Sequence, residues 1–298
     1  MRLGHIGLVG AGSLSRSFIA RMPRLHERLG PVLAPSYRLA SRLVNTLRAG
    51  RAAESYEELE NVQLVLIAVP DGLLPQVLER LASALDRWAG KSVLLCDSRE
   101  DCVVLKPLAE RGAATASLTP VPGLKERYVV EGDRRAVREA RLLVHGSPAQ
   151  VWEMACGRKA VFQAALTFST GMLLPAADAA ARCLRATGLP AAASNSLAEQ
   201  LLDRTLRAYL HGGRKAWGGV LAGPDVAQAS RELAGLEAVD PGLARAYRQL
   251  ARFALEWLER DPGWLERMVA GARTRPAGRS ARPRAEEPTC APLRDGRQ

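Results

Sequence analysis

The sequence predicts an α/β fold in which an N-terminal doubly wound parallel sheet is followed by an all-α domain. Over the first 155 residues, short apolar segments alternate with helical patterns, which is typical of a parallel sheet buried on both faces. After Gly157 the pattern changes to long helices, and no strand pattern returns. We therefore expect an α/β domain over residues 1–155 and an all-α domain over residues 156–270.

The composition is that of an ordinary globular protein. The 298 residues are 47% hydrophobic and 24% charged, which excludes a fibrous or wholly disordered chain. The five cysteines are odd in number and none has C-x-x-C spacing, so we expect neither a disulfide framework nor a metal site. We expect no signal peptide and a location in the reducing cytoplasm. The uncharged run between Lys159 and Asp178 is interrupted by polar residues, which favours a buried helix over a membrane span.

The formal net charge of +11 does not by itself indicate nucleic-acid binding, because the arginines are spread along the chain. Residues 271–298 hold seven arginines against three acidic residues and almost no large apolar side chain. Such a segment buries too little surface to offset its ordering entropy, so we expect a disordered basic tail. A contact of this tail with RNA or an acidic surface remains the alternative to a merely solvated tail.

A glycine-rich turn follows the first expected strand, Leu3–Val9. Gly10 allows a tight turn, and Gly12 lets a pyrophosphate approach the backbone amides at the start of the next helix. This order of strand, turn and helix is typical of the Rossmann fold, and it predicts that the cofactor contacts Gly10, Gly12, Ser13 and Leu14. An ordinary glycine-rich turn is the alternative.

The end of the second expected strand, Pro31–Ala34, favours NADP over NAD. An acidic residue that would bind the ribose hydroxyls of NAD is missing, since no Asp or Glu lies between Glu27 and Glu54. Ser36 and Arg38 follow this strand and can bind a 2′-phosphate. The alternative is that Arg38 belongs to the solvated face of the following helix, Leu39–Leu47.

Further strands are expected at Val62–Val69, Ser92–Cys96 and Ala114–Leu118, with two short ones at Tyr128–Glu131 and Gln150–Trp152. Ligands of such sheets lie beyond the carboxyl ends of the strands. We therefore expect cofactor contacts at Val69, Pro70 and Ser98, and a substrate contact at Thr119.

The second domain is expected to contain helices over Lys159–Thr187, Leu197–His211, Ala227–Leu236 and Leu243–Glu259. The first of them carries a polar stripe on an otherwise apolar surface, at Lys159, Gln163, Thr167 and Thr170. We expect Lys159 to protonate or polarise a carbonyl, Gln163 and Thr167 to orient it, and Thr170 to contact the substrate. Alternatively, Lys159 is exposed and the threonine hydroxyls bond back to helix carbonyls.

Several segments together resemble a known family: Val9-Gly10-Ala11-Gly12, Ile67-Ala68-Val69-Pro70-Asp71, Val130-Glu131-Gly132-Asp133, Phe162 to Gly171 and Ala222-Gly223-Pro224. They look like bacterial proteins in which a Rossmann-like domain precedes the domain of unknown function 2520, an architecture similar to that of 6-phosphogluconate dehydrogenase. The resemblance covers residues 3 to about 258 and implies an NAD(P)-dependent oxidoreductase. It places Gly223 and Asp225 among the substrate-binding residues.

The chain departs from this family where histidines are expected. It has Cys96-Asp97-Ser98-Arg99 in place of His-x-Ser-Gly, Thr119-Pro120 in place of His-Pro, and Phe162-Gln163 in place of Tyr-His. The groups that would exchange protons near neutral pH are thus replaced.

We expect an NADP-dependent oxidoreductase, with NAD as the alternative cofactor, that reduces a small carbonyl, imine or keto-acid substrate between the two domains. The competing hypothesis is a degenerate nucleotide-binding sensor or partner protein, because the expected histidines are missing. The apolar circumference of the long helix predicts a homodimer joined through residues 159–258. Neither a membrane nor a nucleic-acid partner is expected.

Overall fold

The computed structural model describes residues 5–11, 22, 25–145, 149–216, 218–223, 225–259, 261 and 263–273. Its contacts divide the chain into two compact units, Met1–Ser169 and Thr170–Gln298. Residues 156–169, which we expected in the second domain, therefore group with the sheet. Each unit is described by itself.

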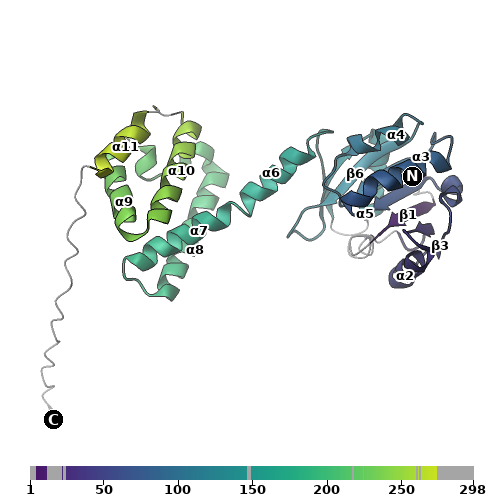
Figure 1. Ribbon diagram of the computed structural model, residues 1–298, viewed down its shortest axis with the longest axis horizontal. Helices are drawn as coiled ribbons and strands as arrows, with labels where there is room; N and C mark the ends of the chain where they lie inside the picture. Colours follow the sequence, from purple (N-terminus) through teal and green to yellow (C-terminus); the bar gives the residue numbers. More distant parts are fainter. Residues whose placement is uncertain are drawn as a thin grey trace, which may run out of the picture. The chain divides into compact units, whose positions relative to one another are not determined.

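The first unit is built on a mostly parallel sheet (Figure 1). In the described part of the chain it has eight strands, in the order β3-β2-β1-β4-β5-β6-β7-β8. Their bounds are β1 (Ile6–Gly10), β2 (Leu29–Leu33), β3 (Arg51–Ala52), β4 (Leu64–Ala68), β5 (Ser92–Cys96), β6 (Ala114–Pro120), β7 (Arg127–Gly132) and β8 (Gln150–Glu153). The predicted doubly wound sheet is confirmed, while the two-residue strand β3 was not predicted.

Helices cover both faces of this sheet, because its central strands are apolar on both sides. One face packs against α2 (Tyr37–Leu47) and α5 (Arg134–Val144). The other packs against α3 (Leu74–Ala84), α4 (Lys106–Ala109) and the short 3₁₀ helices η2 (Tyr56–Asn61) and η4 (Cys102–Leu105). A further 3₁₀ helix, η3 (Asp71–Leu73), connects β4 to α3.

Strand β7 runs antiparallel to β6, so the sheet is mixed at this edge. Gly132, at the end of β7, has a φ of 127°, and a Cβ there would lie 2.3 Å from the carbonyl oxygen of Thr115. The next residue, Asp133, accepts a hydrogen bond from the Thr115 backbone nitrogen at 2.7 Å. The Gly-Asp pair of the sequence motif is therefore needed for the close approach of β7 to β6.

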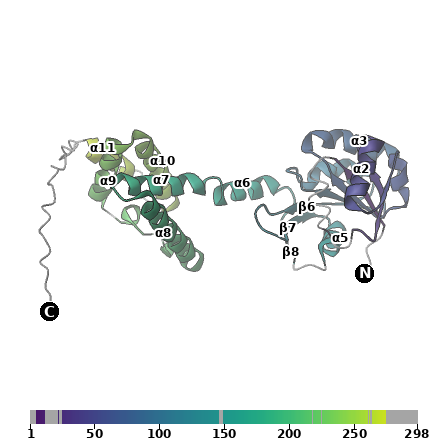
Figure 2. The ribbon, with the colours of Figure 1, turned by 90° about the horizontal axis from the view of Figure 1, so that it is seen from below.

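The described residues of the second unit are helical, as predicted (Figure 2). The helices are α7 (Leu173–Ala186), α8 (Ala191–Gly212), α9 (Val226–Val239), α10 (Pro241–Trp257) and α11 (Gly263–Arg273), with the 3₁₀ helices η5 (Gly213–Ala216) and η6 (Val220–Ala222). Leu233, Leu255, Trp264 and Met268 form the centre of its core, between α9, α10 and α11. Helix α11 was not predicted, and it extends into the segment expected to be a disordered tail. Residues 274–298 lie outside the described residues.

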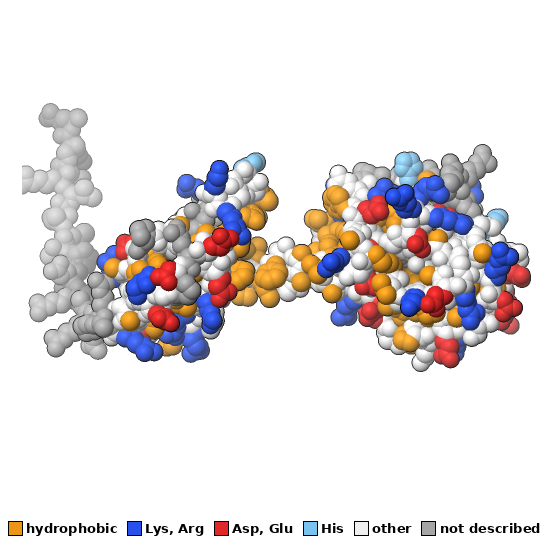
Figure 3. Space-filling model, turned by 90° about the horizontal axis from the view of Figure 1, so that it is seen from above, with side chains coloured by type: hydrophobic (Ala, Val, Ile, Leu, Met, Phe, Trp, Pro, Cys, Tyr) orange, Lys and Arg blue, Asp and Glu red, His pale blue; other side chains and the backbone are white. Residues whose placement is uncertain are grey.

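The long helix expected over Lys159–Thr187 is two helices, α6 (Lys159–Ser169) in the first unit and α7 in the second. The expectation that it is buried is wrong, since Val161, Phe168 and Leu174 are 63%, 57% and 69% exposed. Figure 3 shows hydrophobic side chains at the surface of α6. Taken together, residues 159–186 are long and apolar enough to cross a membrane, by length and composition alone. Apolar periodicity shows how hydrophobic a helix is, but not what covers it.

Candidate functional site

The carboxyl ends of β1, β4, β5 and β6 meet at one edge of the sheet. The parallel register pairs Gly10 with Ala68, Ile67 with Leu95, and Cys96 with Leu118. The polar residues that follow these strands are therefore brought together, as the sequence predicted.

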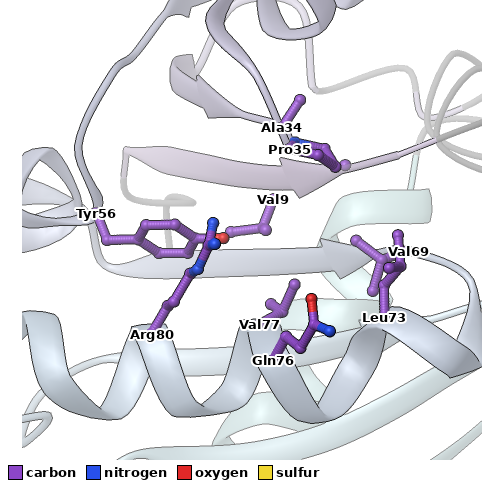
Figure 4. Close-up of a pocket in the computed structure, with 10 residues that line it drawn as sticks. Val9, Ala34, Pro35, Tyr56, Val69, Leu73, Gln76, Val77 and Arg80 are labelled. Carbon is purple, nitrogen blue, oxygen red and sulfur yellow. The ribbon is translucent and has the colours of Figure 1, made fainter.

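A pocket of about 80 Å³ opens at the ends of β1, β2 and β4 (Figure 4). Its walls come from the strand ends, from η2 and from one face of α3. The lining residues are Val9, Gly10, Ala34, Pro35, Tyr56, Val69, Leu73, Gln76, Val77 and Arg80. The guanidinium of Arg80 lies beside the Tyr56 hydroxyl, and burial raises the pKa of Tyr56 against the opposing effect of this positive charge.

Two of the nine predicted cofactor residues, Gly10 and Val69, line this pocket. Ser36 instead caps helix α2, where its hydroxyl accepts a hydrogen bond from the Leu39 nitrogen at 3.4 Å. Arg38 is exposed on the first turn of α2, and Pro70 is exposed at the end of β4. The predicted residues Gly12, Ser13 and Leu14 lie outside the described residues.

The sequence analysis missed Tyr56, Gln76 and Arg80 as pocket residues. Gln76 and Arg80 are four residues apart on α3 and therefore share one face of that helix. That spacing was visible in the sequence, but spacing alone does not show which face of the helix packs next to β1.

The ends of β4 and β5 are joined by Ser98. Its hydroxyl donates to Asp71 Oδ1 at 2.6 Å and accepts from the Glu100 nitrogen at 3.0 Å. Arg99 forms an ion pair with the same Asp71 carboxylate at 3.6 Å. Ser98 is itself 3% exposed, so the structure shows it as a link between strand ends.

Asp97 lies at the same edge in a left-handed backbone conformation, with a φ of 53°. The side chain is half-buried, and burial raises the pKa of its carboxyl group. The positive charge of Lys159 opposes this rise, and the negative charge of Asp71 adds to it. Asp97 is thus an acid whose protonation responds to Lys159.

Lys159, the first residue of α6, is buried with 1% of its surface exposed. Its Nζ donates to the carbonyl oxygen of Glu100 and to the hydroxyl of Ser117, both at 2.8 Å. Ser117 in turn donates to Glu131 Oε1 at 2.9 Å. The alternative that Lys159 is solvent-exposed is therefore wrong. Burial lowers the pKa of Lys159, while the nearby negative groups, Glu131 first, raise it.

The expected polar stripe on α6 is buried only at its start. The Gln163 side chain is half-buried and donates from Nε2 to the Arg99 carbonyl oxygen at 3.1 Å. Thr167 is exposed and donates back to the Gln163 carbonyl oxygen at 3.1 Å, as the alternative interpretation stated. Thr170 is exposed and begins the second unit.

The predicted substrate residues have different surroundings. The Thr119 hydroxyl oxygen, near the end of β6, is buried and has no hydrogen-bond partner among the described residues. Such an unpaired group is costly, so it is a candidate ligand contact. Asp225 caps α9, since its Oδ1 accepts from the Gln228 nitrogen at 2.9 Å, and Gly223 lies in the preceding loop of the second unit. The four histidines, His5, His26, His145 and His211, are all exposed.

Two family models match this arrangement in the expected order. Residues 2–120 match the Rossmann-like domain, and residues 127–253 match the domain of unknown function DUF2520. The chain is a Rossmann–DUF2520 protein. No curated protein matches its sequence.

Solved structures share the fold of this Rossmann–DUF2520 chain at low identity. An imine reductase variant from Myxococcus stipitatus, in complex with NAD⁺, has 17% identity and a TM-score of 0.63, over 90% of this chain and all (100%) of that one. A candidate NADP oxidoreductase from Bacteroides fragilis has 17% identity and a TM-score of 0.63, over 84% and 97% of the two chains. A reductive aminase from Aspergillus terreus, with NADPH and ethyl levulinate, has 14% identity and a TM-score of 0.51, over 89% and 90%.

Proposed function

We propose that this protein is a cytoplasmic NADP-dependent oxidoreductase that reduces a small carbonyl, imine or keto-acid substrate. The observation that carries the proposal is the pocket at the ends of β1, β2 and β4, which includes Gly10 of the glycine-rich turn. Proteins of the same fold have been solved with NADPH or NAD⁺ bound, which supports a nicotinamide cofactor here.

The charges around the pocket support NADP over NAD. The segment between Glu27 and Glu54 holds no acidic residue that would bind ribose hydroxyls and repel a 2′-phosphate. Arg80 lines the pocket itself, and Arg38 lies exposed at the start of α2. Because Ser36 caps α2, we assign the principal phosphate contact to Arg80 rather than to Ser36.

When bound, the cofactor supplies a hydride to the substrate carbon. The accompanying proton goes to the substrate oxygen or nitrogen, and Asp97 is the acid that the strand ends present for it. Lys159 is too deeply buried to contact a substrate directly, so we propose that it sets the protonation of Asp97 through its charge. Gln163 and the unpaired hydroxyl of Thr119 orient the reacting group.

A titration with NADPH and with NADH, followed by nicotinamide fluorescence, tests the cofactor. We expect binding of both, with NADPH tighter. If neither NADPH nor NADH binds, the oxidoreductase function is refuted.

The second candidate function is a nucleotide-binding sensor without catalysis. It is favoured by the pocket lining, which among the described residues holds no histidine. A panel of keto acids, imines and aldehydes, with NADPH oxidation followed by absorbance, separates the two functions. Turnover of any one substrate would refute the sensor function.

We also propose a homodimer joined through residues 159–258. In the first unit, α6 exposes the apolar side chains Val161 and Phe168. In the second unit, α7 exposes Leu173 and Leu174, and Met172 just before it is also exposed. A monomer that exposes such a patch is prone to associate, and a second copy presents the same apolar surface.

A further inference from the structure

Two cysteines and a glutamate converge outside the pocket, at Cys102, Glu131 and Cys156. Their two sulfur atoms and a carboxylate oxygen lie within 4.8 Å of one another. They come from three places in the chain: the first residue of η4, strand β7, and the loop between β8 and α6. Thiolate and carboxylate are the ligand types that zinc takes alongside imidazole.

Hydrogen bonds to the glutamate hold both cysteines in place. Glu131 Oε1 accepts from the backbone nitrogen of Cys102 at 3.1 Å and from the Ser117 hydroxyl at 2.9 Å. Oε2 accepts from the backbone nitrogen of Gly157, which follows Cys156, at 3.1 Å. A carboxylate oxygen can accept twice, so Oε2 can still bind a further partner. The carboxylate thus fixes the backbone at Cys102 and next to Cys156 before any cation binds.

The cluster has both a buried side and an open side. Cys102 and Glu131 are buried, whereas Cys156 is exposed. An ion can therefore enter beside Cys156, and a water molecule can complete a tetrahedral ligand set there.

The charges around the cluster are compatible with a dication despite the nearby Lys159. If a dication displaces the protons of both thiols, the two thiolates add two negative charges to the cluster, and the cation adds two positive charges. The net charge facing the Lys159 ammonium is then unchanged, and the two thiol protons leave to solvent.

We propose that Cys102, Glu131 and Cys156 form a binding site for a zinc-like divalent cation. The site would fasten the loop before α6 to η4 and thereby restrain Lys159 at the start of α6. It does not depend on the proposed oxidoreductase function.

The test uses the reduced, chelator-treated full chain and Co²⁺, followed by displacement with Zn²⁺. We expect one equivalent of Co²⁺ per chain, a sulfur-to-cobalt charge-transfer band in the near ultraviolet, and release of about two protons per ion. Cys156→Ser should weaken binding at least about tenfold, and Glu131→Gln should do the same. Cys156 is exposed, so its replacement leaves the core intact.

The matched control is Cys183→Ser, which removes a thiol in the second unit and should bind Co²⁺ like the unmodified chain. Equal binding by Cys156→Ser and the unmodified chain would overturn the proposal. So would failure of the reduced chain to take up Co²⁺, including the case in which the two thiols only form a disulfide with an added oxidant.

Discussion

Asp97 combines a strained backbone with a perturbed carboxyl group. A left-handed conformation costs a non-glycine residue about 1 kcal/mol, although aspartate tolerates it better than most. Here it occurs at the end of β5, next to Ser98, whose hydroxyl ties this strand end to Asp71. Strain of this kind is frequent at functional sites, which agrees with the role proposed for Asp97.

The coupling of Asp97 to Lys159 predicts a shift in the pH dependence of turnover. Protonated Asp97 is the active form, so kcat/KM should fall as the pH rises through the Asp97 pKa, which burial already raises. Lys159→Met removes the charge that lowers this pKa. The falling limb should therefore move to higher pH, while the Kd for NADPH stays within about twofold.

The control for this shift is Lys215→Met, which removes an exposed lysine of the second unit and should leave the profile in place. A Lys159→Met profile that coincides with that of the unmodified chain would show that Lys159 does not act on the acid.

The position of Arg80 in the pocket leads to a prediction about the preference for NADPH over NADH. Arg80→Ala should weaken NADPH binding about 10- to 150-fold, since a charge-assisted contact with a phosphate is worth about 1.5–3 kcal/mol. NADH binding should change little, because it has no 2′-phosphate. The measurement is the pair of Kd values from nicotinamide fluorescence. Arg38→Ala is the matched variant, and a larger NADPH defect there than in Arg80→Ala would move the phosphate contact to α2.

At the scale of elements, the β6–β7 pair depends on one glycine. Gly132→Ala should reduce the free energy of unfolding by about 3 kcal/mol, because the new Cβ would meet the backbone of Thr115 and Ala116. Gly123→Ala is the control. It also has a positive φ, 77°, but nothing within 4 Å of the added atom, so it should cost only about 1 kcal/mol. Equal unfolding midpoints in urea for the two variants would contradict the crowding at Gly132.

The junction between α9 and α10 predicts acid sensitivity of the helical unit. Hydrogen bonds from the backbone nitrogens of Leu243 and Gly242 lower the pKa of Asp240 below its usual 3.8. A group with a lowered folded-state pKa stabilises the fold at higher pH, and this stabilisation is lost as the pH falls through the folded value. Asp240→Asn keeps a capping side chain but removes the titration.

The urea midpoint of Asp240→Asn should therefore vary less between pH 7 and about pH 3 than that of the unmodified chain. Asp203→Asn on α8 is the comparison, since among the described residues the Asp203 carboxylate accepts only from a side chain, Arg207 Nε at 2.9 Å. If both variants show the same pH dependence, the cap is not responsible.

At the scale of the whole molecule, the exposed apolar surface predicts self-association. Leu174→Asp places a charge on the apolar patch and should shift the light-scattering mass at micromolar concentration from that of two chains toward one. Leu124→Asp changes another exposed leucine, 57% accessible against 69% for Leu174, outside residues 159–258 and should remain dimeric. A mass of one chain for the unmodified protein, independent of concentration, would disprove the homodimer.

The sequence by itself determined the doubly wound sheet and the helical second unit. Buried parallel strands are apolar on both faces, so Val65 and Val93 lie in continuous apolar runs that identify their strands locally. The same local information indicated Gly10 and Val69 at the pocket. It also indicated Lys159 as an unusual polar residue, although not its burial.

Only the tertiary structure decided the contacts between residues that lie far apart in the chain. The pocket wall at Arg80, the bond from Lys159 to Ser117, and the meeting of Cys102 with Cys156 each join separate elements. Spacing in the sequence argued against a metal site, because the two cysteines do not lie in one local motif. Local periodicity encodes which residues are buried, whereas the neighbours of a buried polar group depend on how strands and helices are placed around it.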